Sequence, residues 1–295
     1  MSVLEKKISI IGGDLRIVKL AEMLVDDGYK VYTHALDTAR SLKQNGKVEE
    51  FEKIEDAVEK ADVVIGPIPL SSNKRDINTP FSEKNISLEE LFSKINNKLF
   101  IAGNISDKAY ELAEKNNVEI IDILAREELA VLNTISTAEG AIQIAIQETE
   151  RTLHGSKVLV MGYGRVGKIL SKMLFGLGAK VYCEARKTSD LAWIRAYGYE
   201  PIELKNLRQY LSEFDIIINT IPVLILGEDY LKDLNKDCLI IDLASNPGGV
   251  DKAVAKKLGI KTIWALSLPG KVAPITSAQF IKDTIYNILN ERNNK

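Results

Sequence analysis

The chain has 295 residues, with 39 basic and 41 acidic side chains and a formal net charge of −2 at pH 7. This length predicts about two domains, each with its own core, and the balanced charge without a lysine- and arginine-rich run argues against a nucleic acid partner. No apolar run approaches 18 residues and no Cys, His and acid cluster has metal-ligand spacing, so we expect neither a membrane span nor a bound metal.

The chain contains two cysteines, Cys183 and Cys238, and both lie in apolar, strand-like segments. Its first residues lack the features of a secretory signal peptide. We therefore expect buried free thiols in a protein of the reducing cytoplasm.

The first 130 residues alternate between strand-like and helix-like patterns. We predict strands at 7–11, 30–33, 62–66, 99–102 and 119–122, and helices at 15–27 and 106–116. Such alternation is typical of an open α/β domain with a parallel sheet. The segment 67–85, rich in proline, serine and charge, predicts a long loop after a strand, a place where loops are often functional.

A helical pattern follows over residues 127–151, with apolar Ala141, Ile142, Ala145 and Ile146 on one face. Ser136 or Thr137 is the expected N-cap, and the linking helix is assigned to 131–152.

The second half repeats the α/β plan over residues 153–274. The predicted strands are 157–161, 180–183, 214–219, 238–242 and 261–265, and the predicted helices are 165–177, 190–197 and 251–258. A carboxyl-terminal helix within 275–295 is expected to pack back on the first domain. The fold class is therefore α/β, with two doubly wound Rossmann-like domains with parallel sheets, joined by a helical hinge, and with cofactor and substrate in the interdomain cleft.

The turn after strand 157–161 has the G-x-G-x-x-G spacing of a dinucleotide site and reads Gly162-Tyr163-Gly164-Arg165-Val166-Gly167. The first glycine permits a tight turn, the second lets the backbone approach a pyrophosphate, and the third lets the helix pack on the strand. The helix N-terminus adds N–H donors and positive potential. A nicotinamide dinucleotide is the expected cofactor.

The residues after the second strand of this unit bear on the choice between NADP and NAD. They read Glu184-Ala185-Arg186-Lys187. Arg186 and Lys187 favour a 2′-phosphate and hence NADP. A shift of one residue in the strand would instead aim Glu184 at the ribose and give an NAD site.

Three later loops follow strands and carry further candidates for cofactor binding: Thr220, Ile221 and Pro222; Asp242, Ala244 and Ser245; and Leu268. The last loop continues to Lys271, which could meet an anion. The alternatives are a proline-terminated strand, a simple turn and a solvated lysine.

In the first half, Gly12-Gly13-Asp14-Leu15-Arg16 opens a helix without the full dinucleotide spacing, so we predict substrate binding there. Asp14 could equally be only an N-cap. The remaining candidates for binding substrate carboxylates are Gly13, Ser71, Ser72, Arg126, Thr137 and Ser245. For Arg126, Ser71 and Ser72 the alternative is a place on the solvated surface. Glu139, expected in the first turn of the linking helix, could be a dipole-matching acid.

These motifs together resemble one family. Gly162 to Lys168, Ala185-Arg186-Lys187, Asp242 to Ser245 with Pro247-Gly248-Gly249, and Leu268 to Pro274 resemble the A subunit of dipicolinate synthase. Gly12-Gly13-Asp14 and Thr137-Ala138-Glu139-Gly140 resemble the amino-terminal half of the same family. The resemblance covers nearly the whole chain.

The resemblance implies a sporulation enzyme of the mother-cell cytoplasm that oxidises a dihydrodipicolinate-type intermediate to pyridine-2,6-dicarboxylate with NADP, together with the flavoprotein-like B subunit of dipicolinate synthase. Positioning would dominate catalysis, because aromatisation supplies driving force. If water must also leave, Glu139 or Asp14 is the candidate acid or base, and Lys271 a further catalytic candidate.

The competing interpretations are a non-catalytic NADP-binding scaffold and a methylene-tetrahydrofolate-type dehydrogenase. A 2-hydroxyacid dehydrogenase is disfavoured because no histidine follows His154. The sequence leaves the oligomeric state open, a homo-oligomer included.

Overall fold

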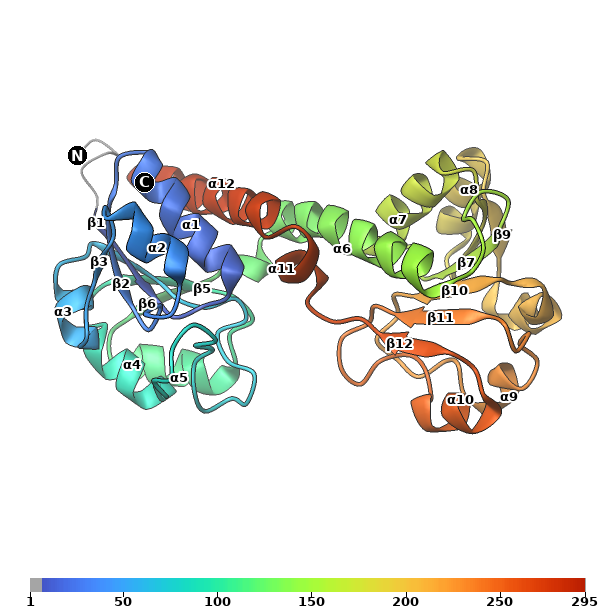
Figure 1. The fold of residues 1–295 in the computed structure, drawn as a ribbon, viewed down its shortest axis with the longest axis horizontal. Helices are drawn as coiled ribbons and strands as arrows, with labels where there is room; N and C mark the ends of the chain where they lie inside the picture. Colours follow the sequence, from blue (N-terminus) through green and yellow to red (C-terminus); the bar gives the residue numbers. More distant parts are fainter. Residues whose placement is uncertain (1–6, 295) are drawn as a thin grey trace. The chain divides into compact units, whose positions relative to one another are not determined.

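The computed structural model describes residues 7–294. The chain divides into two compact units, Met1–Leu132 with Ala273–Lys295, and Asn133–Val272. Each unit is an open parallel sheet with helices on both faces (Figure 1). The prediction of two Rossmann-like α/β domains is therefore confirmed.

The first unit has six parallel strands in the order β3-β2-β1-β4-β5-β6. These strands are β1 (Lys7–Ile11), β2 (Lys30–His34), β3 (Glu49–Glu50), β4 (Val63–Ile65), β5 (Leu99–Ala102) and β6 (Glu119–Asp122). Its helices are α1 (Leu15–Asp26), α2 (Arg40–Asn45), α3 (Ile54–Glu59), α4 (Leu88–Lys94), α5 (Asp107–Lys115) and α12 (Pro274–Asn293). The chain reverses its direction of winding between β1 and β4, where ligands of such sheets bind at the carboxyl ends of the strands.

The second unit repeats this plan with the order β12-β11-β10-β7-β8-β9. Its strands are β7 (Lys157–Met161), β8 (Lys180–Glu184), β9 (Glu200–Ile202), β10 (Ile216–Asn219), β11 (Leu239–Asp242) and β12 (Thr262–Trp264). Its helices are α7 (Arg165–Gly176), α8 (Thr188–Ala196), α9 (Glu228–Leu231), α10 (Lys252–Leu258) and α11 (Leu268–Val272). Winding reverses between β7 and β10, next to the glycine-rich turn.

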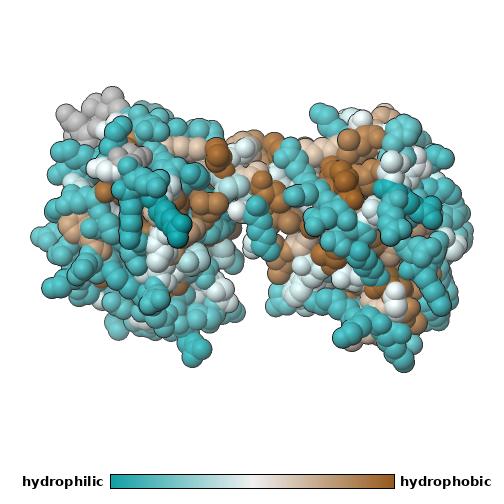
Figure 2. All heavy atoms as spheres, in the orientation of Figure 1, coloured by the Kyte–Doolittle hydropathy of each residue, from teal (hydrophilic) through white to brown (hydrophobic). Residues whose placement is uncertain are grey.

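The central strands are apolar on both sides because helices cover both faces of each sheet. In β7, Val158 and Val160 pack in one cluster with Leu170 and Leu174 of α7, whereas Leu159 and Met161 belong to the cluster on the opposite face. The visible surface of each unit is mainly hydrophilic, with apolar patches (Figure 2). β7 therefore contributes to two separate cores.

Both cysteines are buried free thiols, as predicted. Burial raises the pKa of Cys183 to about 12, and its sulfur lies 3.1 Å from the hydroxyl of Ser171. Burial likewise raises the pKa of Cys238 to about 12. Both groups are therefore protonated, unreactive core residues at neutral pH.

One continuous helix, α6 (Glu127–Glu148), replaces the linking helix predicted to start at Ser136 or Thr137. That N-cap prediction is wrong, because both residues lie inside the helix. The Thr137 hydroxyl donates to the carbonyl of Asn133 at 2.8 Å, which satisfies it without ending the helix.

By length and composition α6 is apolar enough to cross a membrane, a test that helices buried in a core also pass. Ala138, Ala141 and Ala145 lie in the core of the second unit. The absence of a membrane span stays a prediction.

Several element boundaries differ from those predicted. The strand β8 continues through Glu184 instead of ending at Cys183, which brings Glu184 into register with the neighbouring strand. The short elements α2, α3, α4 and β9 were not predicted, since they are too brief to show a period. Residues 67–85 form a long loop without helix or extended strand, as predicted.

The helix α7 packs very closely on the turn that precedes it. A Cβ added to Gly167 would lie 2.0 Å from the carbonyl oxygen of Gly162, whereas one added to Gly176 at the other end of the helix would meet nothing within 4 Å. Gly167 is therefore required by the packing of the helix against the strand–turn connection, as its place in the motif predicts.

The last helix, α12, packs on α1 inside the first unit. Ala278, Ile281, Ile285 and Leu289 of α12 share a core cluster with the first sheet. At the end of α1, the carboxylate of Asp27 accepts hydrogen bonds from Lys282 Nζ at 2.7 Å and from the Tyr286 hydroxyl at 2.6 Å. These two bonds hold the pKa of Asp27 below its ordinary value.

We expect Asp27→Asn to lower the free energy of unfolding by about 1–2 kcal/mol at pH 7, because it weakens two charge-assisted hydrogen bonds. The contribution of Asp27 is present above the unfolded pKa of about 3.9 and is lost as the pH falls through the lower folded pKa. Urea unfolding should therefore show the difference between wild type and variant shrinking below about pH 4. The exposed neighbour provides the control: Asp26→Asn should change little at either pH.

We expect Gly167→Ala to destabilise the second unit by about 2–3 kcal/mol, since the new methyl group must displace backbone. Gly176→Ala, on the same helix, should stabilise it by about 0.5–1 kcal/mol by removing a helix glycine. Chemical denaturation of both variants tests the pair. Similar effects of the two substitutions would contradict the close packing at Gly167.

Candidate functional site

The glycine-rich turn leaves an opening beside the N-terminus of α7. Gly162 adopts a positive φ of 88°, and a Cβ there would lie 2.6 Å from the Thr220 hydroxyl. Gly164 is the N-cap residue of α7, and a Cβ added to it would meet nothing within 4 Å. No described protein atom therefore fills the space in front of Gly164, where a ligand backbone could approach.

A cavity of about 540 Å³ lies at this helix N-terminus. Its lining combines the glycine turn with the ends of β8 and β10: Gly162, Tyr163, Gly164, Arg165, Lys168, Glu184, Ala185, Arg186, Lys187, Asp190, Thr220, Ile221 and Pro222. No acidic residue occupies the first turn of α7, so the helix dipole and backbone N–H groups favour an anion. This cavity brings together most of the residues predicted to bind the cofactor.

Within the turn, Tyr163 and Val166 differ from the glycines in their environment. Tyr163 is 6% exposed and packs in the core, with the Lys168 ammonium 5.7 Å from the centroid of its ring. Burial raises the pKa of its hydroxyl. Val166 is half-buried and Arg165 exposed at the start of α7. Any cofactor contact from Tyr163 must therefore come mainly from its backbone.

Glu184 is the last residue of β8 and pairs in register with Met161, the last residue of β7. It is 1% exposed, and its Oε2 accepts the Gly162 N–H at 3.2 Å. Its other oxygen, Oε1, is buried without a hydrogen-bond partner. Burial raises the pKa of this carboxyl, while the Gly162 N–H and the charge of Arg186 act in the opposite direction.

Arg186 and Lys187 follow the strand and are exposed at the cavity. The strand therefore ends on the acid that the NAD alternative requires, with two cations directly beyond it. The acid expected of an NAD site and the cations expected of an NADP site therefore line the same cavity.

The loop after β10 covers the turn. The Thr220 hydroxyl donates to the Met161 carbonyl at 2.8 Å, so this side chain anchors the loop to β7. Ile221 and Pro222 line the cavity. Val223 and Leu224, which follow Pro222 in the chain, are exposed at 62% and 57%.

Asp242 ends β11 and organises the loop that follows it. Its Oδ1 accepts hydrogen bonds from Asn219 Nδ2 at 2.8 Å and from the Ala244 N–H at 3.1 Å, and its Oδ2 accepts the Gly249 N–H at 2.9 Å. The side chain is fully buried. Asp242 therefore shapes the loop, and direct contact with a cofactor stays a prediction. Ser245, on the same loop, is exposed.

The part played by Asn219 was not predicted from the sequence. Its amide bridges Asp242 and the carbonyl of Ile221 at 3.0 Å, so one side chain ties together the loops after β10 and β11. The available signal was a polar residue ending an otherwise apolar strand, paired in register with the acid that ends the next one.

The segment Leu268–Val272 is the short helix α11, not an extended loop at the end of a strand as predicted. Leu268 is 5% exposed and packs against α6, where a Cβ added to Gly140 would lie 3.1 Å from the Leu268 Cβ. The absence of a side chain at Gly140 makes room for this contact. Lys271 is exposed on α11.

Glu139 is also placed differently from the prediction. It is exposed well inside α6, not in the first turn, so it does not match the helix dipole. It lies beside an apolar strip that includes Ile142 and Ile146.

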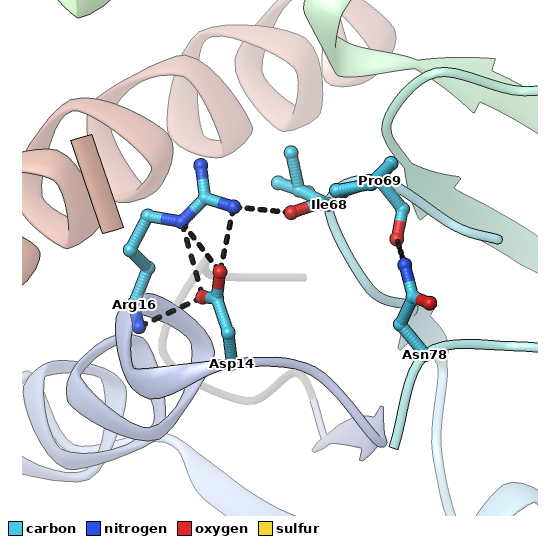
Figure 3. A network of polar contacts seen from close by, with 5 residues as sticks. All are labelled: Asp14, Arg16, Ile68, Pro69 and Asn78. Carbon is cyan, nitrogen blue, oxygen red and sulfur yellow. Dashed lines mark hydrogen bonds and ion pairs between the residues drawn. The ribbon is translucent and has the colours of Figure 1, made fainter. Parts of the chain in front are cut away.

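In the first unit, Asp14 and Arg16 form a fixed pair at the end of β1 (Figure 3). Asp14 is the N-cap of α1 and accepts the Arg16 N–H at 3.0 Å, which confirms the N-cap alternative. Arg16 Nη2 also donates to Asp14 Oδ2 at 2.7 Å and to the Ile68 carbonyl. The remaining terminal nitrogen of Arg16 points away from both partners (Figure 3). A buried guanidinium is thereby held in one orientation with a donor to spare.

Asn78 fastens the long loop to the glycines after β1. Its amide donates to the Pro69 carbonyl at 2.7 Å (Figure 3), and its backbone carbonyl accepts the Gly13 N–H at 2.9 Å. The Ser72 hydroxyl donates to Asn78 Oδ1 at 2.8 Å, and Ser71 donates to Asn73 Oδ1 at 3.2 Å. The backbone N–H of Gly13 and both serine hydroxyls thus have partners within the protein. Sequence reasoning did not single out Asn78, because nothing local marks a residue that bridges two distant segments.

Arg126 is occupied by two carboxylates of its own unit. It donates to Glu128 at 2.8 Å and to both oxygens of Glu291 at 2.9 and 2.6 Å. These bonds raise the pKa of the guanidinium. Arg126 therefore ties α12 to the start of α6, and its binding of a substrate carboxylate stays a prediction.

Two family descriptions match the chain. One is the N-terminal domain of the dipicolinate synthase A subunit, over residues 7–124, and the other is the NAD binding domain of D-isomer specific 2-hydroxyacid dehydrogenases, over residues 129–268. A curated relative, the dipicolinate synthase A subunit of Bacillus subtilis (strain 168), is 33% identical over 97% of this chain and 96% of its own length.

Solved structures agree with this relationship. The dipicolinate synthase A subunit from Bacillus halodurans has a TM-score of 0.87 and 32% identity, covering 96% of this chain and 97% of that one. The Bacillus subtilis protein has a TM-score of 0.86 and 31% identity, with 97% and 96% coverage. A transhydrogenase from Sinorhizobium meliloti, 17% identical with a TM-score of 0.72 and coverage of 97% and 94%, shares the fold alone. The second unit is an NAD-binding dehydrogenase domain, and the chain as a whole belongs to the family of dipicolinate synthase A subunits.

Proposed function

We propose that the chain is an NADP-dependent dehydrogenase that oxidises a dihydrodipicolinate-type intermediate to dipicolinate in sporulation, acting with the B subunit of dipicolinate synthase. The observation that carries the proposal is the open, cation-lined cavity at Gly164, in a chain similar over 97% of its length to a curated dipicolinate synthase A subunit. The oxidation removes a hydride and a proton from the dihydropyridine ring.

The residues of the cavity fit a nicotinamide dinucleotide. The N–H groups at the start of α7 would hold its pyrophosphate, and the absence of a side chain at Gly164 permits the approach. Arg186 and Lys187 would hold a 2′-phosphate by charge-assisted hydrogen bonds. When bound, the nicotinamide ring supplies the hydride acceptor.

The substrate carries two carboxylates, and Arg16 is the candidate cation to orient one of them. Asp14 and the Ile68 carbonyl fix its guanidinium, which keeps one terminal nitrogen for a ligand. Such pre-organisation saves side-chain entropy on binding. Because aromatisation favours the product, accurate positioning supplies much of the catalysis.

The released proton needs an acceptor, and Glu139 is a stronger candidate than Asp14. The carboxylate of Asp14 caps α1 and pairs with Arg16, whereas Glu139 is exposed and has no polar side-chain partner among the described residues. Lys271 is exposed as well and would serve to attract the anionic substrate.

The turnover experiment combines the purified chain with dihydrodipicolinate synthase, its substrates and NADP or NAD. We expect reduced cofactor and dipicolinate to appear together. Adding or omitting a candidate B subunit shows whether the partner is required. Cofactor binding without product under all these conditions would favour a scaffold role, and activity only with a methylene-tetrahydrofolate substrate would replace the proposed substrate.

Arg186→Ala tests the 2′-phosphate assignment. We expect it to weaken NADP binding by roughly 1–3 kcal/mol, because one charge-assisted phosphate contact is lost, and to leave NAD binding nearly unchanged. Fluorescence titration with each cofactor measures both. Arg195→Ala, which removes an exposed cation of α8 outside the cavity, is the matched control. Equal losses for NADP and NAD in Arg186→Ala would rule out the assignment.

A further inference from the structure

We propose that Glu184 is a specificity residue that couples the choice of cofactor to one proton: NAD binds with Glu184 ionised, and NADP binds with Glu184 protonated. The inference rests on the proposed function, since it requires a dinucleotide in the cavity at α7. It assigns to the buried acid a role distinct from that of the exposed cations.

The geometry leaves Glu184 short of donors. The single Gly162 N–H is shared between the carbonyl oxygen of Glu184 and its Oε2, at 3.2 Å from each. Oε1 receives no hydrogen bond although it is buried. A buried acceptor without a partner is unfavourable, and the cavity that Glu184 lines is where a partner can arrive.

The two cofactors offer this acid opposite chemistry. The ribose of NAD has a 2′-hydroxyl that can donate to an ionised carboxylate. A 2′-phosphate instead presents acceptor oxygens and about −1.5 to −2 charges. An ionised Glu184 would repel it, whereas a protonated Glu184 donates its O–H to a phosphate oxygen.

The charged groups around Glu184 allow it to be either ionised or protonated. The basic groups that line the same cavity come from two elements: Arg165 and Lys168 from α7, and Arg186 and Lys187 from the segment after β8. The charge of Arg186 favours the ionised acid, and the cations of the cavity attract a phosphate.

The acidic groups are fewer. Asp190 of α8 lines the cavity, and Glu203, beyond the neighbouring strand β9, pairs with Lys205. Burial remains the largest influence on Glu184 and raises its pKa, so the acid takes up a proton more readily than an exposed carboxylate does.

Calorimetric titration of the whole chain in buffers of different ionisation enthalpy counts the protons. We expect NADP binding at pH 7–8 to take up a net proton, approaching one, and NAD binding to take up none. The cofactor cannot supply this uptake, because a cationic site lowers the pKa of a phosphate and so releases protons. Net uptake in the wild-type protein is thus a signature that needs no variant.

Glu184→Gln keeps the shape and offers a permanent N–H donor. We expect NADP to bind this variant tenfold or more tightly than wild type at pH 8, without proton uptake, while NAD binds more weakly. In the wild type, the NADP dissociation constant should rise by up to tenfold for each unit increase in pH, when it is compared with the dissociation constant of the variant at the same pH. Glu203→Gln, an exposed acid outside the cavity, should retain the wild-type proton count.

The outcomes separate two failures. Binding of both cofactors with the same proton count, or identical NADP pH profiles in wild type and Glu184→Gln, would overturn the inference and leave the proposed function standing. Failure of the folded wild-type chain to bind either cofactor would overturn the proposed function. If Glu184→Gln does not fold, the wild-type proton counts for NADP and NAD decide the matter alone.

Discussion

The close approach of α7 to the turn at Gly162 is the constraint on which the site depends. It brings the N-terminus of a twelve-residue helix against the end of β7, so that the N–H groups of its first turn, which have no partner within the helix, lie beside the cavity. In the same turn, the Gly162 N–H meets the carbonyl and carboxylate of Glu184 at the end of β8. A side chain at Gly167 would meet the Gly162 carbonyl and displace the helix from the turn.

The two units share one strand order, but the surroundings of their glycine turns differ. In the first unit the Gly12 N–H donates to the carbonyl of His34 at the end of β2, as Gly162 does to Glu184 in the second. His34 is buried, which lowers its pKa, and it contacts the Phe51 carbonyl. A Cβ on Gly12 would lie 2.9 Å from the Asn78 carbonyl oxygen, just as one on Gly162 would lie 2.6 Å from the Thr220 hydroxyl, so a loop packs against both turns. The turns differ two residues later, where Asp14 caps α1 and pairs with Arg16 but Gly164 leaves open space, which suits a dinucleotide in the second unit.

Among the buried acids of the second unit, Asp242 has hydrogen-bond partners for both oxygens, whereas Glu184 does not. Asp242 and Asn219 satisfy each other and the loop backbone, so they fix the shape of the carboxyl end of the sheet. Glu184, equally buried, keeps one oxygen without a partner. Buried acids that end strands of one sheet can thus differ, one with both oxygens hydrogen-bonded and one with an oxygen left without a partner, and only the hydrogen-bond partners distinguish them.

The sequence by itself determined the α/β class, the strands 7–11, 99–102, 119–122 and 157–161, and the glycine turn, because apolar periodicity and glycine spacing are local properties. The tertiary structure decided the rest. Strand pairing extended β8 to Glu184. The hydroxyl of Thr137 bonds within α6, so this residue continues the helix and does not begin it. Leu268 is buried because it packs on α6. Asp14 and Arg126 found partners that no local pattern specifies, Glu291 lying far along the chain from Arg126. Side-chain partners depend on segments brought together by folding, which is why residue types alone did not separate structural charges from those left for a ligand.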